Sequence, residues 1–159
     1  MPDSSLITLR AATAADQDFL LAVFAGTRSD ELAALAWDPK MGQAFLEMQF
    51  RMQAQNYKAA HPTAENNIIL NEGAPVGRML VDRTEQAIKL VDIAILPDHR
   101  SAGIGSKLIQ SLLDEAATSG REVQLSVFKT NPAARLYERL GFSTVADDGV
   151  YFEMSWRNT

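Results

Sequence analysis

The sequence has no cysteine and only two histidines, His61 and His99. It therefore contains no disulfide, no thiolate nucleophile and no cysteine ligand for zinc. A histidine-rich metal site is not expected either, and we predict no metal. No apolar run reaches the length of about 20 residues that a membrane-spanning helix needs. The N-terminal residues do not show the pattern of a secretory signal. We therefore expect a cytoplasmic protein that does not associate with a membrane.

Positive charge is in deficit, with 15 Lys and Arg residues against 20 Asp and Glu residues and a net charge of -5. This balance argues against a general nucleic-acid-binding protein, which needs a basic face. A local basic patch remains compatible with it, because Arg100 and Lys107 lie close together in sequence. The hydrophobic content of 47% is typical of a globular chain, and 159 residues suit one domain spanning residues 1–159.

One stretch organises the chain. An apolar run rich in β-branched residues predicts a strand that ends at Pro97, since proline cannot donate to a ladder. The sequence Arg100-Ser-Ala-Gly-Ile-Gly105 follows and leads into a helix. Gly103 and Gly105 carry no β-carbon, so the backbone can approach a ligand closely. The unpaired N–H groups and the dipole at a helix start favour phosphate.

Several phosphate-binding loops can be compared with this spacing. A Walker A loop requires Gly-Lys-Ser/Thr, whereas Gly105 is followed by Ser106 and then Lys107. A dinucleotide-binding loop requires a third glycine where Leu108 stands, and glycines placed directly after the strand. A loop whose glycines serve packing alone is the remaining alternative. The spacing Arg-x-x-Gly-x-Gly is compared below with a fourth kind of loop.

Hydrophobic periodicity and turn signals predict a mixed α/β (α+β) architecture. A strand–helix–strand crossover follows an antiparallel middle, so we expect a mixed, mostly antiparallel sheet of six to seven strands with helices on both faces. The polar segment 26–31 is predicted to be a loop. Strands are expected at 6–10, 67–70, 75–82, 87–96, 122–128, 142–146 and 150–156, and helices from about 16 to 25, at 39–60, from the glycine loop to Gly120, and from Pro132 to Gly141.

A second motif, Asn131-Pro-Ala-Ala-Arg-Leu-Tyr-Glu-Arg-Leu-Gly-Phe142, follows at the appropriate separation. Together the two motifs resemble the signatures of the GNAT acyltransferase superfamily, whose Arg/Gln-x-x-Gly-x-Gly/Ala loop wraps the pyrophosphate of coenzyme A. The resemblance extends from Asn67 to the C-terminus, and before Asn67 it is one of layout. It implies acetyl-CoA as cofactor. It also implies cofactor contacts from Ile93, Ala94, Ile95, Arg100, Ser101, Ala102, Gly103, Ile104, Gly105, Ser106, Asn131, Ala134 and Tyr137.

The resemblance further implies a catalytic role for Tyr137, which would protonate the departing thiolate. With reference pKa values near 8.5 for a thiol and 10 for tyrosine, the transfer is slightly uphill, so Tyr137 should help by at most about 10²- to 10⁴-fold. Two alternatives stay open. Asn131 before proline is also a good helix cap, and Tyr137 would serve equally well as a packing residue.

The acceptor and the general base are not fixed by the sequence. Asp92 lies on the predicted cofactor strand, but alternation does not decide which way it points. Glu31 lies where the acceptor should enter, although a surface charge is the simpler interpretation. Arg28 and Trp37 in the same region would suit an acceptor carboxylate and an apolar group, and Trp37 is equally suited to the core.

Two functions remain in competition. The first is an N-acetyltransferase that moves the acetyl group of acetyl-CoA to a primary amine of a small molecule or peptide. The second is a non-catalytic acyl-CoA-binding or regulatory module on the same fold, since fold does not prove function. Tyr137 and the glycine loop favour catalysis. The expected partner is the amine acceptor, with no nucleic acid and no membrane, and a homodimer is left open.

Overall fold

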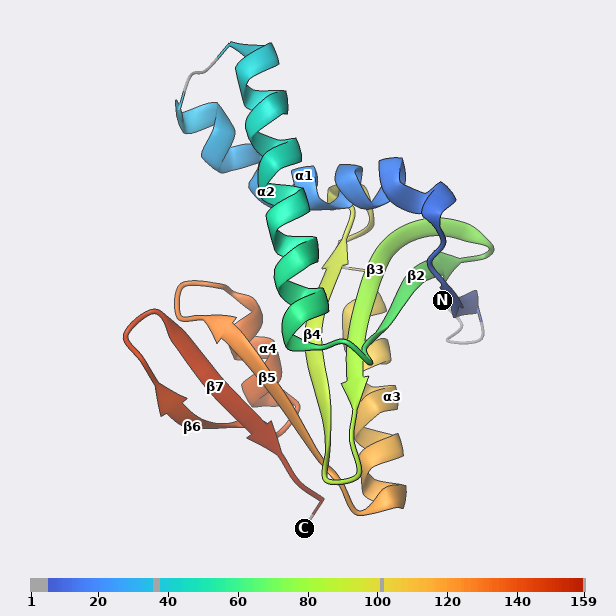
Figure 1. Cartoon of the computed structure of the whole chain (residues 1–159). Helices are drawn as coiled ribbons and strands as arrows, with labels where there is room; N and C mark the ends of the chain where they lie inside the picture. Colours follow the sequence, from blue (N-terminus) through green and yellow to red (C-terminus); the bar gives the residue numbers. More distant parts are fainter. Residues whose placement is uncertain (1–5, 36–37, 101, 159) are drawn as a thin grey trace. The chain divides into compact units, whose positions relative to one another are not determined.

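The structure is a computed structural model that describes residues 6–35, 38–100 and 102–158; for residues 29–35 it describes the backbone alone. Within these ranges, seven strands hydrogen-bond in the order β1-β2-β3-β4-β5-β7-β6, which confirms the predicted mixed sheet (Figure 1). The strands are β1 (Ile7–Ala11), β2 (Glu65–Asn71), β3 (Ala74–Arg83), β4 (Ala87–Ile95), β5 (Glu122–Phe128), β6 (Ser143–Asp147) and β7 (Tyr151–Trp156), and the helices are α1 (Gln17–Leu35), α2 (Pro39–Ala60), α3 (Ile104–Ser119) and α4 (Ala133–Arg139).

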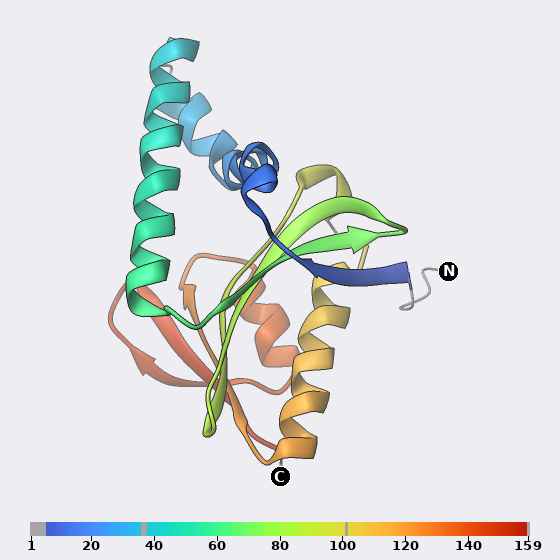
Figure 2. The same cartoon turned by 45° about the vertical axis from the view of Figure 1, so that its right-hand side comes forward.

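The chain divides into two compact units, and β3 and β4 each contribute residues to both. The first unit comprises residues 1–80 and 92–102 and contains α1, α2, β1 and β2. Strand β1 pairs antiparallel with β2, from Ile7 opposite Asn71 to Ala11 opposite Asn67, and Figure 2 shows them side by side. Apolar side chains of this unit, among them Val23, Phe24, Ile68 and Ile69, are buried.

Helix α1 begins after a 3₁₀ turn that Thr13 caps. The Thr13 hydroxyl accepts a hydrogen bond from the Ala15 N–H, and the Asp16 carboxylate accepts one from the Thr13 N–H at 2.7 Å. These reciprocal bonds satisfy N–H groups that have no partner inside a helix. Arg10 adds two hydrogen bonds to the same carboxylate, at 2.8 and 2.9 Å.

The predicted loop over residues 26–31 is wrong, because α1 continues through it to Leu35. Its polar composition suggested a loop, yet the segment that follows is rich in Glu, Leu and Ala, which favour helix. Gly26, a weak helix former, has a packing reason to be there. A β-carbon at Gly26 would stand 3.0 Å from the Cδ of Pro97. The glycine therefore allows the turn after β4 to lie against α1.

Helix α2 spans Pro39–Ala60, as predicted. The Asp38 carboxylate accepts a hydrogen bond from the Lys40 N–H, and Pro39 occupies the first turn, where no intrahelical N–H is needed. His61, before Pro62, ends the helix. No helix in the described ranges is long and apolar enough to cross a membrane.

The second unit comprises residues 81–91 and 103–159. The first half of β4 pairs parallel with β5, from Ala87 opposite Glu122 to Leu90 opposite Leu125. Strand β5 pairs antiparallel with β7, which also pairs with β6. Helix α3 buries a stripe of apolar residues on one face and ends, as predicted, at Gly120, whose φ of +70° suits glycine. The buried members of the stripe are Ile104, Leu108, Ile109, Leu112, Leu113 and Ala116.

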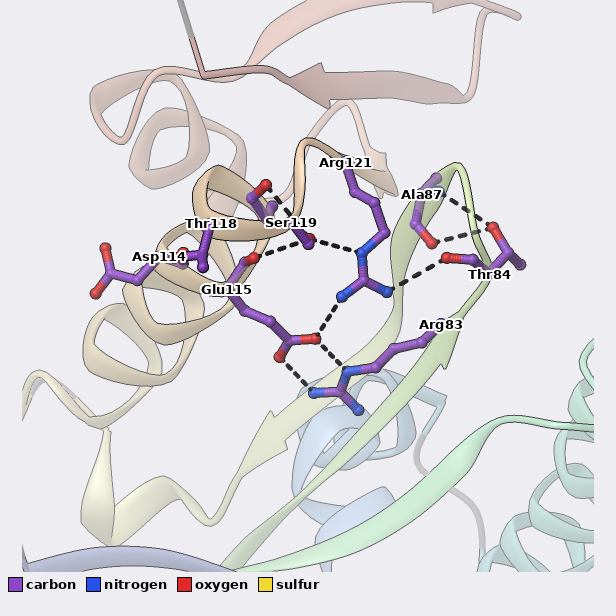
Figure 3. Close-up of polar contacts among 9 residues, drawn as sticks. Arg83, Thr84, Ala87, Asp114, Glu115, Thr118, Ser119 and Arg121 are labelled. Carbon is purple, nitrogen blue, oxygen red and sulfur yellow. Dashed lines mark hydrogen bonds and ion pairs between the residues drawn. The ribbon is translucent and has the colours of Figure 1, made fainter.

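An ion-pair network in the second unit joins α3 to the last residue of β3 and to the residue before β5 (Figure 3). The Glu115 carboxylate accepts hydrogen bonds from Arg83 Nε at 2.7 Å and from Arg121 Nη2 at 3.0 Å. Arg121 also donates to the Thr84 carbonyl oxygen at 3.3 Å. The hydrogen bonds from Arg83 lower the pKa of Glu115, and Arg121 acts in the same direction. Because Glu115 is partly exposed, each pair contributes about 1 kcal/mol or less.

Candidate functional site

The glycine loop presents an uncapped helix start. After the 3₁₀ turn Pro97–His99, the backbone reaches Gly103, which has a φ of +79° and precedes α3 without a side-chain cap. The first helical hydrogen bond runs from the Lys107 N–H to the Gly103 carbonyl oxygen. A β-carbon at Gly103 would meet no atom of the described residues within 4 Å. Both features suit an anion that takes up the N–H groups of Ile104, Gly105 and Ser106.

The other predicted cofactor residues of this loop are Arg100, Ser101 and Ala102. Arg100 is exposed, and part of its guanidinium holds the loop in place. Its Nε donates to the Ile95 carbonyl oxygen at 2.9 Å, and its Nη2 donates to the Gly26 carbonyl oxygen at 3.3 Å. Sequence reasoning assigned Arg100 to phosphate alone, so this positioning contact is new. Ala102 is exposed beside Gly103, and Ser101 lies outside the described residues.

The end of β4 lies against β3 without room for side chains between the backbones. The Leu96 N–H donates to the Val76 carbonyl oxygen at 2.8 Å. A β-carbon at Gly77 would stand 2.3 Å from the Ala94 carbonyl oxygen. The predicted cofactor residues Ile93, Ala94 and Ile95 are half-buried in this stretch of β4.

Asp92 and Arg28, two predicted substrate residues, come together with a third group, Arg78. The side chain of Arg78 on β3 is 9% exposed, and its Nε lies 3.8 Å from Asp92 Oδ2. Burial raises the pKa of the Asp92 carboxyl above its ordinary value, while Arg78, the Ile93 N–H and Arg28 lower it. A half-buried carboxyl with a raised pKa is a candidate proton acceptor.

The second signature motif forms α4 in the second unit. Asn131 Oδ1 accepts a hydrogen bond from the Ala133 N–H at 2.9 Å, so Asn131 does cap the helix. Its side-chain amide nitrogen has no hydrogen-bond partner among the described residues. Ala134 is buried, and Tyr137 is 7% exposed with its ring centroid 5.7 Å from that of Phe142. Tyr137 therefore packs in the core, whatever else its hydroxyl does.

The first unit contains a shallow depression of about 420 Å³, lined by α1 and α2 residues that include Arg28, Met48, Met52 and Tyr57. Arg28 was predicted as a substrate residue. Met48 and Met52 are exposed, and methionine side chains adapt readily to different shapes. The backbone of Glu31 lies in α1, its side chain is outside the description, and Trp37 lies outside the described residues.

Sequence reasoning missed Arg78 and Tyr57. The guanidinium carbon of Arg78 lies 5.8 Å from the centre of the Tyr57 ring, a cation–π distance. A signal for Arg78 was available, since it is one charge within the otherwise apolar run from Val76 to Val81. No comparable signal marked Tyr57 on α2. Among the described residues, no group of three or more His, Asp or Glu side chains is arranged to hold a metal.

Residues 63–144 match the family described as the acetyltransferase (GNAT) domain, which is more than half of the chain. The chain therefore belongs to the GNAT acetyltransferase family. Membership confirms the family that the two sequence motifs predicted.

The chain is also similar to an uncharacterized N-acetyltransferase, CgeE of Bacillus subtilis (strain 168), with 29% identity over 99 residues, covering 55% of this chain and 38% of the relative. The chain thus spans about two fifths of the length of this curated relative. Among solved structures, it resembles a PaiA N-acetyltransferase from Thermoplasma acidophilum in complex with coenzyme A, with a TM-score of 0.69, 15% identity and coverage of 96% of this chain and 99% of that one.

A second solved structure is a histone acetyltransferase HPA2 and related acetyltransferase from Corynebacterium glutamicum ATCC 13032. Its TM-score is 0.67 at 24% identity, covering 96% of this chain and 97% of that one. At these identities the likeness shows the fold, which agrees with the strand order described above.

Proposed function

We propose that the chain is an N-acetyltransferase that transfers the acetyl group of acetyl-CoA to a primary amine of a small molecule or peptide. The observation that carries the proposal is Gly103, which leaves the start of α3 uncapped and faces open space. That arrangement supports a pyrophosphate held by main-chain N–H groups of residues 101–106. Arg100, whose guanidinium is exposed, adds positive charge at the same loop.

The other predicted cofactor residues fit this role to different extents. The backbone of Ile93–Ile95 would hydrogen-bond the pantetheine arm as a strand does. Asn131 would donate from its amide nitrogen, because Oδ1 already caps α4. Ala134 is buried, so its part is to fill space behind the site. We also propose that the two units act as one acetyltransferase domain spanning residues 1–159.

The chemistry requires a neutral amine, a stabilised oxyanion and a protonated leaving group. The amine nitrogen forms a bond to the acetyl carbon, and the bond from that carbon to sulfur breaks. Asp92 would take the proton that the ammonium loses, and its raised pKa suits that role. A main-chain N–H of Ile93–Ile95 would stabilise the oxyanion. Tyr137 would give its proton to the thiolate and would regain one from the attacking nitrogen, which has a second proton to lose.

Two measurements test the proposal. Acetyl-CoA should raise the melting temperature by mass action, and NAD should not. Thiol release from acetyl-CoA over a panel of primary amines should reveal turnover. Binding without turnover over a broad panel would favour the non-catalytic acyl-CoA-binding module. Equal thermal shifts from NAD and acetyl-CoA would contradict the cofactor assignment.

A further inference from the structure

We propose that the acceptor is an amino-acid-type compound, an amine with a neighbouring carboxylate and an apolar side chain, held in the first unit by Arg28, Asp92 and the depression on α1 and α2. This inference rests on the proposed acetyltransferase function and names the class of its acceptor. Three observations support it: an excess of positive charge among the described side chains, two arginine N–H groups without a described acceptor, and the residues that line the depression.

The charges at this place do not balance. Arg28 and Arg78 both act electrostatically on Asp92, and Asp92 Oδ2 lies 3.8 Å from Arg78 Nε. The cluster of these three side chains therefore carries two guanidinium groups and one carboxylate. Arginine remains protonated in proteins, so among the described side chains one positive charge is left for a ligand to neutralise.

Two N–H groups without a described acceptor also indicate that an anion binds here. Arg28 Nε and Arg78 Nε are both shielded from solvent and have no hydrogen-bond acceptor among the described residues. A buried donor left unpaired costs about 1–3 kcal/mol, and most such groups in proteins are paired. Because Arg78 already faces Asp92, Arg28 is the better partner for an incoming anion.

Arg28 is also fixed in position. Its guanidinium carbon lies 4.8 Å from the centre of the Phe24 ring, and its side chain lines the depression. A guanidinium held over an aromatic ring presents a planar fork that matches a carboxylate in two parallel hydrogen bonds. The geometry thus provides a carboxylate subsite at Arg28, whose charge acts on Asp92, the proposed acceptor of the amine proton.

The rest of the lining is mixed: the amides of Gln49, Gln53 and Asn56 supply polar groups, and the other side chains form a part suited to an apolar or aromatic group. Phe45, Met48, Met52 and Tyr57 contribute to a depression of about 420 Å³, within the range of small-molecule sites. Methionine side chains adapt to different shapes. A polyamine would add positive charge beside two arginines, and a peptide amine would bring a neutral carbonyl where Arg28 requires an anion.

The experiment compares phenylalanine with phenylalaninamide, which has the same shape and amine but no carboxylate. Thiol release should give a kcat/KM at least about tenfold higher for phenylalanine, the fold-change expected for one charge-assisted hydrogen bond. Arg28→Gln should raise the KM for phenylalanine about 10- to 100-fold at unchanged kcat, and should leave phenylalaninamide nearly unaffected. Arg28→Lys should restore part of the difference. Arg51→Gln, which removes an exposed charge from α2, is the matched control.

Calorimetric binding of the two ligands to the protein with coenzyme A provides a readout that does not depend on turnover. Preferential binding of phenylalanine that Arg28→Gln removes supports the inference even if no amine is acetylated, in which case the proposed function alone fails. Equal binding of both ligands, or binding of neither while other amines are acetylated, overturns the inference and leaves the proposed function standing. Absence of both binding and turnover overturns both.

Discussion

Gly77 and Ala94 are in backbone contact, so close that a β-carbon on Gly77 would stand 2.3 Å from the Ala94 carbonyl oxygen and 3.1 Å from the Ile95 Cα. Any side chain at residue 77 would therefore push against the strand that we propose holds the pantetheine arm. Backbone cannot move aside as a flexible side chain does, which makes this a position where glycine is required for close approach.

We expect Gly77→Ala to lower the free energy of unfolding by about 1–3 kcal/mol or more, as overpacking does. Gly42→Ala is the control, because Gly42 lies in α2 with nothing within 4 Å of a β-carbon. That substitution should stabilise the protein by up to about 1 kcal/mol through helix propensity. Urea denaturation measures both. Two small, equal changes would show that β3 and β4 separate at this point without cost.

The second prediction compares two glycines at opposite ends of α3. Gly103 and Gly120 both have a left-handed φ, +79° and +70°, and a β-carbon at either meets nothing within 4 Å. Alanine should therefore cost a similar strain, about 1–2 kcal/mol, at both positions. Only Gly103→Ala should also weaken coenzyme A binding in calorimetry, because its methyl group enters the proposed phosphate site. Equal affinities for the two variants would assign the loop a structural role.

Local signals explain how much of the fold could be predicted. Asp38-Pro39 and His61-Pro62 fixed α2 from adjacent residues, and Gly120 fixed the end of α3. The end of α1 could not be predicted, because Gly26 is tolerated in a helix through its contact with Pro97, which is distant in sequence. Such a contact exists only after the chain has folded.

The residues of the candidate site likewise fall into those that the sequence predicted and those that it did not. The spacing of Arg100 and Gly103 and the motif beginning at Asn131 located the cofactor residues from sequence. Arg78 was missed because its importance comes from Asp92 on the next strand and Tyr57 on a helix. Its partners are set by the pairing of strands and the packing of α2, which a linear pattern does not encode.

The third prediction concerns stability at acid pH. Hydrogen bonds from Arg10, and then from the Thr13 N–H, hold the pKa of Asp16 well below its usual range. Its stabilising effect is therefore complete above the ordinary pKa of aspartate, near 3.9, and declines as pH falls toward the lower folded-state value. Asp16→Asn should lower the melting temperature at pH 7, and the difference should narrow below about pH 4. Asp18→Asn, at an exposed position in α1, is the control for scans at pH 7, 5, 4 and 3. A pH-independent difference would contradict a role through charge.

The fourth prediction tests Asp92 as the proton acceptor. Asp92→Asn should reduce kcat/KM about 10²- to 10⁴-fold at neutral pH, and the loss should shrink as pH approaches the pKa of the amine, which then needs no base. Because burial raises the pKa of Asp92, wild-type activity should fall on the acid side at a higher pH than an ordinary aspartate would give. Asp114→Asn, on the exposed face of α3, is the control and should change neither kcat/KM nor its pH dependence. A pH-independent loss with a lowered melting temperature would instead assign Asp92 to neutralising Arg78.

The last prediction separates chemistry from packing at Tyr137. Its ring packs against Phe142, so Tyr137→Phe keeps the ring and removes only the hydroxyl. The variant should keep the melting temperature and the affinity for acetyl-CoA, while turnover falls about 10- to 1000-fold, as for the loss of one general acid. The loss should diminish as pH rises past the thiol pKa, near 8.5, because a thiolate then leaves without a proton. Tyr151→Phe, at an exposed position of β7, is the matched control. Normal turnover would leave Tyr137 with packing alone, and weakened acetyl-CoA binding would move its role to holding the cosubstrate.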